Sequence, residues 1–420
     1  MNKITFAFKN MINQKIGRLE EQWKYDSGAL LLAPAIIGDV DNDGKKEIIF
    51  GTKDGKIISI DIDGKLKWSF SAEEKYSDVE LMFLDAENTN SIHSTPNIED
   101  INHDGKKEII FGTESGRLFV LDNHGKVLWN YKVNGPIRGA PIIQRFANNQ
   151  VGIIFGSGDK NLYFLNGDGK LFWKFQCESE IESCPGFIMG QQPLIIFGTN
   201  DGTIYALNLK AELIWTFNTK GKILAQPVFT KLSATMPPTI LIGSTDGNMY
   251  CLTENGELLW DFHTAGAICS RAAVEDINHD GNKEIVFGSC DNSVYAIDCK
   301  GKRIWSYETD FWVVATPIIT DLDSDGKLEV IIGSYDHNIY VLDSEGSYVL
   351  DYVPGVSGIV AQTGQTGDAM NKEPGKIQGK KIWQYQTDGV IVGCAYIDGH
   401  NNIIVNTDSG KVDNIVHKKE

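Results

Sequence analysis

Short apolar runs alternate with turn residues along the whole chain, and no segment keeps a helical period. Residues 272–308 show the pattern, because AAVEDI, EIVFGS, SVYAID and KRIWSYE are separated by HDG, CDN and CKG. The runs are rich in β-branched and aromatic residues and recur about every ten residues, as strands of antiparallel sheets do. We therefore expect an all-β fold.

The same four-strand pattern recurs eight times. One marker is a tryptophan followed two residues later by an aromatic residue, at Trp23, Trp68, Trp129, Trp173, Trp215, Trp260, Trp305 and Trp383. A second marker, typified by IIFGTKDG, begins at Ile48, Ile109, Ile153, Ile195, Ile240, Ile285, Val330 and Ile403. Four strands in 40–50 residues are typical of a propeller blade. Residues 17–420 are thus predicted to form an eight-bladed β-propeller of four-stranded antiparallel blades, with residues 1–16 as an N-terminal tail.

The two ends of the chain indicate how the ring closes. The last repeat stops before its tryptophan strand, whereas LEEQWKYD, near the N-terminus, is a tryptophan strand without a blade. We expect this N-terminal strand to complete the last blade. Such closure would leave no open sheet edge in the ring.

Two repeats carry insertions, at about residues 73–90 and 352–379. The first is acidic with an apolar centre and reads as a docking surface or a local cap, and the second is a glycine-rich excursion. Both are candidates for function, since variable loops on a repeating scaffold often bind. The second insertion also leaves two candidates for the outer strand of repeat seven, around Leu350 or around Trp383. The spacing to the next repeat favours Trp383, which places the excursion between the third and fourth strands.

Runs such as YAIDCKGKRIW, which ends at Trp305, carry a glycine four residues before the tryptophan. They resemble the tryptophan-docking repeat of the pyrroloquinoline-quinone-like propellers, in which the indole packs between neighbouring blades. The resemblance covers residues 17–420 and departs in repeat four, where Ala211 replaces the glycine. No two cysteines are adjacent as in the quinone-dependent dehydrogenases, so we do not expect a quinone.

Four repeats carry an acidic loop between their first two predicted strands. In DVDNDGKKE, residues 39–47, oxygen-bearing side chains stand at positions 1, 3, 5 and 9 and a glycine at position 6. The backbone carbonyl at position 7 can add another oxygen, and a divalent ion would offset the repulsion between the carboxylates. The alternative is an Asx-rich turn without a metal.

These loops resemble the calcium loops of FG-GAP propellers, which implies about four structural Ca²⁺ ions. The ligand candidates, with position 7 acting through its backbone, are Asp39, Asp41, Asp43, Lys45 and Glu47; Asp100, Asn102, Asp104, Lys106 and Glu108; Asp276, Asn278, Asp280, Asn282 and Glu284; Asp321, Asp323, Asp325, Lys327 and Glu329.

The composition argues against some classes of partner but does not identify the partner. A net charge of −17 argues against nucleic acid, and no apolar run is long enough for a membrane span. Unpaired cysteines and an N-terminus unlike a signal peptide favour a cytoplasmic location, whereas calcium loops of this kind suit an extracytoplasmic one. The sequence therefore weakly favours the cytoplasm, and an extracytoplasmic location is the alternative.

No nucleotide loop, nucleophile elbow or zinc-protease motif occurs in the sequence. His93, Arg138, Glu182 and Arg271 are predicted to face the central channel. We therefore predict a calcium-stabilised binding or assembly scaffold whose partner is a protein. Carbohydrate recognition and an enzyme at the channel mouth are the alternatives.

Overall fold

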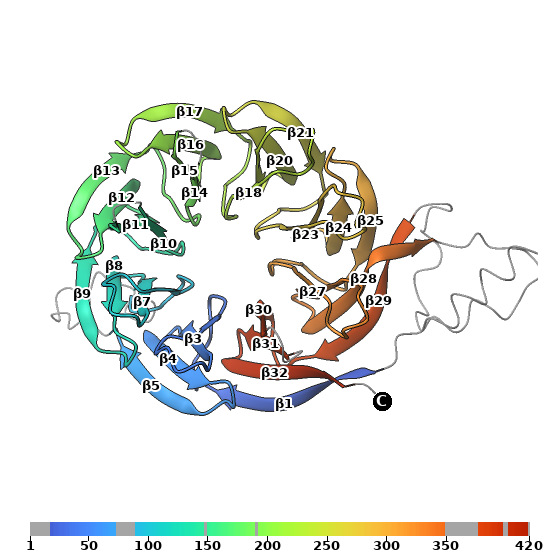
Figure 1. Cartoon of the computed structure of the whole chain (residues 1–420), viewed down its shortest axis with the longest axis horizontal. Helices are drawn as coiled ribbons and strands as arrows, with labels where there is room; N and C mark the ends of the chain where they lie inside the picture. Colours follow the sequence, from blue (N-terminus) through green and yellow to red (C-terminus); the bar gives the residue numbers. More distant parts are fainter. Residues whose placement is uncertain are drawn as a thin grey trace, which may run out of the picture.

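The computed structural model describes residues 17–72, 89–146, 149–189, 192–348, 377–397 and 402–418. The strands form eight separate four-stranded sheets arranged in a ring (Figure 1). Every strand pair is antiparallel, so the predicted all-β, eight-bladed propeller is confirmed. None of the described elements is a helix with the length and hydropathy of a membrane span.

Each blade runs from an inner first strand to an outer fourth strand. Blades one to four consist of β2 (Ile36–Gly38), β3 (Glu47–Gly51), β4 (Lys56–Asp61) and β5 (Leu66–Ser71); β6 (Asn97–Glu99), β7 (Glu108–Gly112), β8 (Arg117–Leu121) and β9 (Val127–Lys132); β10 (Ile142–Arg145), β11 (Val151–Gly156), β12 (Asn161–Asn166) and β13 (Leu171–Gln176); β14 (Gly186–Ile188), β15 (Leu194–Gly198), β16 (Thr203–Asn208) and β17 (Leu213–Asn218).

Blades five to seven repeat this order, and blade eight takes its outer strand from the N-terminus. They consist of β18 (Val228–Thr230), β19 (Thr239–Gly243), β20 (Asn248–Thr253) and β21 (Leu258–His263); β22 (Ala273–Glu275), β23 (Glu284–Ser289), β24 (Ser293–Ile297) and β25 (Arg303–Glu308); β26 (Ile318–Thr320), β27 (Glu329–Gly333), β28 (Asn338–Tyr348) and β29 (Ile377–Gln386); β30 (Ile391–Ile397), β31 (Asn402–Thr407), β32 (Lys411–Lys418) and β1 (Arg18–Asp26).

The ring closes as the sequence predicts. Strand β1 pairs antiparallel with β32, with Arg18 opposite Lys418 and Asp26 opposite Lys411. Figure 1 shows the blue N-terminal strand lying along the red C-terminal blade. The first and last blades are therefore held together by a shared sheet.

The outer strand of blade seven contains Trp383, as predicted. Trp383 lies opposite Val341 of β28, and its side chain is 7% exposed. The chain leaves β28 at Tyr348 and re-enters β29 at Ile377, so the second insertion connects the third and fourth strands. Leu350, residues 349–376 and residues 73–88 of the first insertion lie outside the described residues.

The second strands supply the core of each blade. All five residues of β3 and of β7 are buried, and Phe50 and Phe111 have no exposed surface. Aromatic contacts then join neighbouring blades, as where Phe262 of β21 meets Tyr295 of β24 with ring centroids 5.5 Å apart. The core is thus continuous around the ring.

Each docking tryptophan joins its blade to the next one. Its indole Nε1 donates a hydrogen bond of 2.7–3.1 Å to a backbone carbonyl of the following blade. The indole also packs on the turn glycine of that blade: Gly125 has φ 80°, and a Cβ there would lie 2.5 Å from Trp68. Ala211 adopts φ 62° at this position in blade four, a conformation that costs a non-glycine residue roughly 1–2 kcal/mol.

The closing strand also completes this docking series. Trp383 of blade seven donates to the carbonyl of Gly17 at 2.9 Å, and Trp23 of β1 donates to Ile62 of blade one at 2.9 Å. The N-terminal segment therefore provides an outer strand, a docking tryptophan and the last docking acceptor.

One carboxyl group is buried at the junction of blades seven and eight. Asp413 of β32 occupies the repeat position that Tyr340 occupies in the third strand of blade seven. The side chain of Asp413 is 0% exposed. No donor among the described residues hydrogen-bonds either carboxylate oxygen, and Lys24 Nζ is 3.9 Å from Oδ1. Burial therefore raises the pKa of Asp413 to about 6.

Trp23→Ala is expected to lower the free energy of unfolding by about 3 kcal/mol, because it removes a docked aromatic side chain from the closing strand. Urea unfolding of the full chain measures the loss. Trp312→Ala is the control, since Trp312 is outside the docking series and 45% exposed. Equal losses in the two variants would contradict the closure.

Asp413→Asn is expected to stabilise the protein at pH 7 and to flatten the dependence of its stability on pH. A raised carboxyl pKa means that the folded state holds a proton that the unfolded state has lost. The contribution of Asp413 is therefore largest below about pH 4 and is lost as the pH rises to about 6. Between pH 7 and pH 5 the wild type should gain about 1 kcal/mol relative to the variant in urea unfolding. Parallel pH profiles of the unfolding free energy in the wild type and in Asp413→Asn would refute the raised pKa of Asp413.

Candidate functional site

The four acidic loops share one backbone conformation. They connect the first and second strands of blades one, two, six and seven, at residues 39–46, 100–107, 276–283 and 321–328. The residue at position 4 is left-handed in every loop, with φ of 58–66°, and the glycine at position 6 has φ 86°. These residues are Asn42, His103, His279 and Ser324, and Gly44, Gly105, Gly281 and Gly326.

A buried glutamate at position 9 anchors each loop. Its side chain is at most 2% exposed and accepts the backbone N–H of position 2 at 2.8–3.0 Å. The acceptors are Glu47, Glu108, Glu284 and Glu329, and the donors are Val40, Ile101, Ile277 and Leu322. The carboxylate at position 1 accepts the N–H of the glycine at 2.9–3.1 Å. The loops are thus Asx-type turns closed by their own hydrogen bonds.

The side chains at positions 1, 3 and 5 converge in two of the loops. Asp39, Asp41 and Asp43 each place a carboxylate oxygen within 4.8 Å of the others, and the same holds for Asp321, Asp323 and Asp325. Hard oxygen ligands gathered in this way suit Ca²⁺, which takes six to eight of them.

Position 3 is an asparagine in blades two and six, at Asn102 and Asn278. The position-7 residues Lys45, Lys106, Asn282 and Lys327 donate their N–H groups to the position-5 carboxylates at 2.7–2.8 Å. The convergence of carboxylates is shown for blades one and seven among the described residues, and the full ligand set of the four loops stays a prediction.

Crowding of carboxylates shifts the pKa values in these loops. Burial, aided by Asp280 and Asp276, raises the pKa of Glu284 to about 7. Burial likewise raises the pKa of Glu108. In blade one a carboxyl group at a different position, position 3, shows the opposite shift: a hydrogen bond from Lys67 lowers the pKa of Asp41. Lys67 was not among the residues predicted from the sequence.

Three of the four predicted channel residues, His93, Arg138 and Glu182, lie around one ion-pair network centred on Arg138. Arg138 Nε lies 3.1 and 3.0 Å from the two carboxylate oxygens of Glu114, and its Nη1 lies 2.6 Å from Glu182 Oε1. His93 Nε2 is 4.0 Å from Glu114 Oε2, and burial lowers the pKa of His93. Both glutamates are bound to the same guanidinium, which is a structural arrangement rather than a general acid paired with a general base. Glu114, in a turn of blade two, was not predicted.

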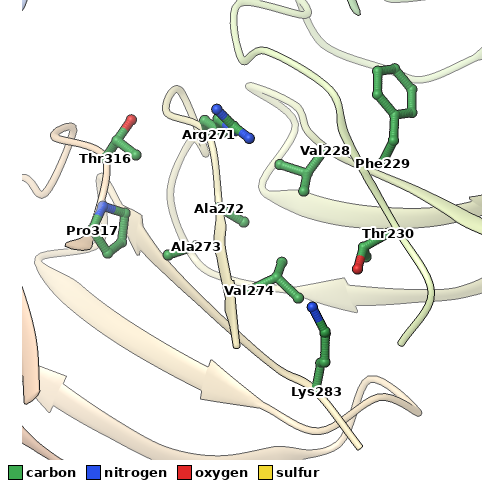
Figure 2. Close-up of a pocket in the computed structure, with 10 residues that line it drawn as sticks. All are labelled: Val228, Phe229, Thr230, Arg271, Ala272, Ala273, Val274, Lys283, Thr316 and Pro317. Atoms are coloured by element: carbon green, nitrogen blue, oxygen red, sulfur yellow. The ribbon is translucent and has the colours of Figure 1, made fainter. Parts of the chain in front are cut away.

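Arg271, the fourth channel residue, lines a separate cavity of about 340 Å³. Figure 2 shows Arg271 and Lys283 at opposite ends of the segment Ala272–Val274. Val228 and Pro317 add apolar surface from the neighbouring blades. Arg271 and Lys283 are the two charged side chains that line the cavity, so its lining carries positive charge.

An exposed aromatic cluster lies between blades six and seven. Phe311 and Trp312, in the connection from β25 to β26, are 46% and 45% exposed and stack with ring centroids 5.2 Å apart. Tyr335 lies 6.3 Å from Trp312 between ring centroids, and its N–H donates to the Trp312 carbonyl at 2.8 Å. We refer to Phe311, Trp312 and Tyr335 as the aromatic cluster.

This cluster breaks the pattern of the repeat. Four other connections have a glycine where Phe311 stands, namely Gly135, Gly221, Gly266 and Gly389. In three of them a Cβ would lie 2.3 Å from a backbone nitrogen of the adjoining turn. The sequence signal was available, because Trp312 is the ninth tryptophan in a chain with eight docking positions.

The aromatic cluster and the acidic loops lie on opposite faces of the ring. The loops connect first to second strands, whereas residues 309–317 connect a fourth strand to the next first strand. Since strands alternate in direction within a blade, these two kinds of connection lie at opposite ends of the strands. The Arg138 network is on the face of the aromatic cluster, because it too is built from connections into first strands and from a turn between second and third strands.

The model of one family, described as the lambda-carrageenase beta-propeller domain, matches residues 95–181, 194–270 and 264–354. Together these matches span more than half of the chain. No curated protein matches it.

Among solved structures, 1468 chains match, so the fold alone does not select a function. BamB from Moraxella catarrhalis is 15% identical, with a TM-score of 0.64, and the match covers 96% of this chain and 98% of BamB. The C-terminal WD40 domain of Sif2 is 14% identical, with a TM-score of 0.61 and coverage of 96% and 99%. BBS1N in complex with ARL6DN is 8% identical, with a TM-score of 0.55 and coverage of 96% and 98%. These likenesses establish a shared fold.

Proposed function

The chain belongs to the lambda-carrageenase beta-propeller domain family, and we propose that it is a calcium-stabilised recognition scaffold that binds a protein through the face carrying the aromatic cluster. The propeller scaffold itself is established by the fold. The partner class and the calcium ions are the proposal.

The aromatic cluster carries this proposal. Phe311 and Trp312 are held in place by the backbone, since the Phe311 carbonyl accepts Ser334 Oγ at 3.1 Å and Thr309 Oγ1 at 2.7 Å. Their rings are nevertheless about half exposed, which leaves apolar surface for a partner. Rigid, exposed tryptophan is the side chain most typical of protein-binding hot spots. Phe311 stands where four other connections have glycine, and a bulky exposed side chain at such a position favours a role in binding over one in folding.

Calcium is proposed for the opposite face. Support comes from the common geometry of the loops and from the carboxylates of Asp321, Asp323 and Asp325, which converge within 4.8 Å. An ion there would neutralise charge at the end of a buried strand and tie the loop to it. Its role would be structural, with stability gained by binding to the folded state alone.

Carbohydrate binding is the second candidate. The family takes its name from a carrageenase, an enzyme that acts on a polysaccharide. An exposed indole can also stack on a sugar ring, so the aromatic cluster would serve that function as well. A glycan array that includes carrageenan, with an assay for newly formed reducing ends, tests carbohydrate binding and catalysis together.

Calcium is expected to raise the melting temperature of the protein, and EDTA to reverse the rise. At a free concentration of 100 times Kd, each loaded loop should add about 2.7 kcal/mol. Thermal melts in calcium, in magnesium and in EDTA measure the effect. Identical melts in calcium and EDTA would exclude the proposed ions.

A photo-crosslinking amino acid in place of Trp312 is expected to capture one protein species from the native host. The same substitution at Phe172 is the control, because Phe172 is 51% exposed on the outer strand β13, away from the aromatic cluster. With the captured protein, Trp312→Ala should weaken binding at least about 30-fold. Glycan binding that depends on Trp312, without any protein adduct, would replace the protein proposal with the carbohydrate one.

A further inference from the structure

Two cysteines of blade six lie side by side, although they are far apart in the sequence. Cys269 stands in the connection that leads into β22, and Cys290 stands in the turn between β23 and β24. The Cys290 N–H donates to the carbonyl of Ala267 at 2.9 Å, which holds the turn against the connection. The thiols of Cys269 and Cys290 hydrogen-bond to one another. Both residues are partly exposed, and neither is in a disulfide.

The backbone of the repeat brings these two positions together. In blade two they are occupied by His93 and Glu114, whose Nε2 and Oε2 atoms lie 4.0 Å apart. There the Glu114 N–H donates to the carbonyl of Ser91 at 3.0 Å, as Cys290 does in blade six. The thiol contact therefore follows from geometry that the blades share.

Blade six is the one blade in which both positions are cysteine. The corresponding pairs in the six remaining blades are Leu32 and Lys53, Arg138 and Gly158, Glu182 and Asn200, Leu224 and Thr245, Val314 and Tyr335, and Val392 and Asp408.

The shared hydrogen bond makes the two thiols chemically different. Accepting it lowers the pKa of Cys290, against the opposing effects of burial and of the Asp291 charge. Donating it raises the pKa of Cys269. Since the thiolate is the reactive form of cysteine, Cys290 is the more nucleophilic of the two. Burial raises the pKa of the other five cysteines, all among the described residues: Cys177, Cys184, Cys251, Cys299 and Cys394.

We propose that Cys269 and Cys290 form a redox modification site, which a hydroperoxide converts reversibly into a disulfide. The Cys290 thiolate attacks one peroxide oxygen, so that an S–O bond forms, the O–O bond breaks and the thiol proton leaves with the alcohol. The Cys269 sulfur then attacks the Cys290 sulfur. The S–S bond forms, the S–O bond breaks, and the hydroxide leaves as water with the Cys269 proton. The two sulfurs lose two electrons to the peroxide, and a dithiol reductant returns them by exchange.

The surroundings of the pair suit this chemistry. Hydrogen-bonded sulfur atoms need only a short approach to reach the S–S bond length of about 2.05 Å. The pair also lies on the face of the aromatic cluster, because it is built from a connection into a first strand and a turn between second and third strands. Burial raises the pKa of Tyr335, and Cys290 and Cys269 add to the shift, so Tyr335 lies near both thiols. The site thus adjoins the proposed recognition surface, but the inference does not depend on what binds there.

Oxidation of the folded full chain with hydrogen peroxide tests the proposal. Thiols are titrated in denaturant, and the alkylated protein is mapped by peptide mass spectrometry. The wild type should lose two of its seven thiols, yield a peptide pair linked through Cys269 and Cys290, and regain both thiols in dithiothreitol. Seven remaining thiols would overturn the proposal, and so would a disulfide between other cysteines or a Cys290 sulfinic acid formed without a disulfide.

Single variants separate the roles of the two thiols. Cys269→Ser should stop at the Cys290 sulfenic acid, which dimedone traps, whereas Cys290→Ser should keep all of its thiols. Cys184→Ser is the control and should still form the disulfide, because the Cys184 thiol donates to the carbonyl of Ala140 at 3.1 Å. Equal oxidation of Cys290→Ser and the wild type would contradict the assignment. If a variant fails to fold, the peptide map of the wild type decides alone.

Discussion

The docking of each tryptophan on the next blade is the interaction on which the rest of the structure depends. The eight indole hydrogen bonds fix where every fourth strand lies, and in six blades the indole docks beside a left-handed turn residue, namely Gly64, Gly125, Gly169, Ala211, Gly256 and Gly301. The same interaction closes the ring. The Trp383 indole donates to the carbonyl of Gly17, and the Trp23 indole donates to the carbonyl of Ile62 in blade one. Once the blades are held in this way, their loops are free to vary without loss of the fold.

Function is therefore best sought where one blade departs from the rule that the others follow. Phe311 replaces the small residue of other connections, and both Phe311 and Trp312 are about half exposed. Lys67 places a charge where the other outer strands carry an uncharged side chain. Neither departure disturbs a docking contact. Lys67 and the aromatic cluster also lie at opposite ends of the strands. The proposed cation sites and the proposed recognition surface are therefore on different faces of the ring.

The sequence predicted the features that repeat and missed those that depend on contacts between distant segments. Eight tryptophans fixed the blade count and identified Trp383 as the outer strand of blade seven, because spacing is a local property. The contact of Lys67 with Asp41 could not be predicted, since it depends on how the fourth strand crosses the loop. The burial of Asp413 was missed for a related reason: the closing strand comes from the other end of the chain. The pairing of Arg138 with Glu114 likewise depends on how two connections 24 residues apart approach each other in the fold.

Hydrogen exchange by mass spectrometry, with and without calcium, tests most directly the claim that the two faces act separately. The account predicts slower exchange in residues 39–46, 100–107, 276–283 and 321–328 when calcium is added. It also predicts no change in residues 309–317 on the opposite face. Protection that extends to residues 309–317, or no protection in any acidic loop, would contradict it.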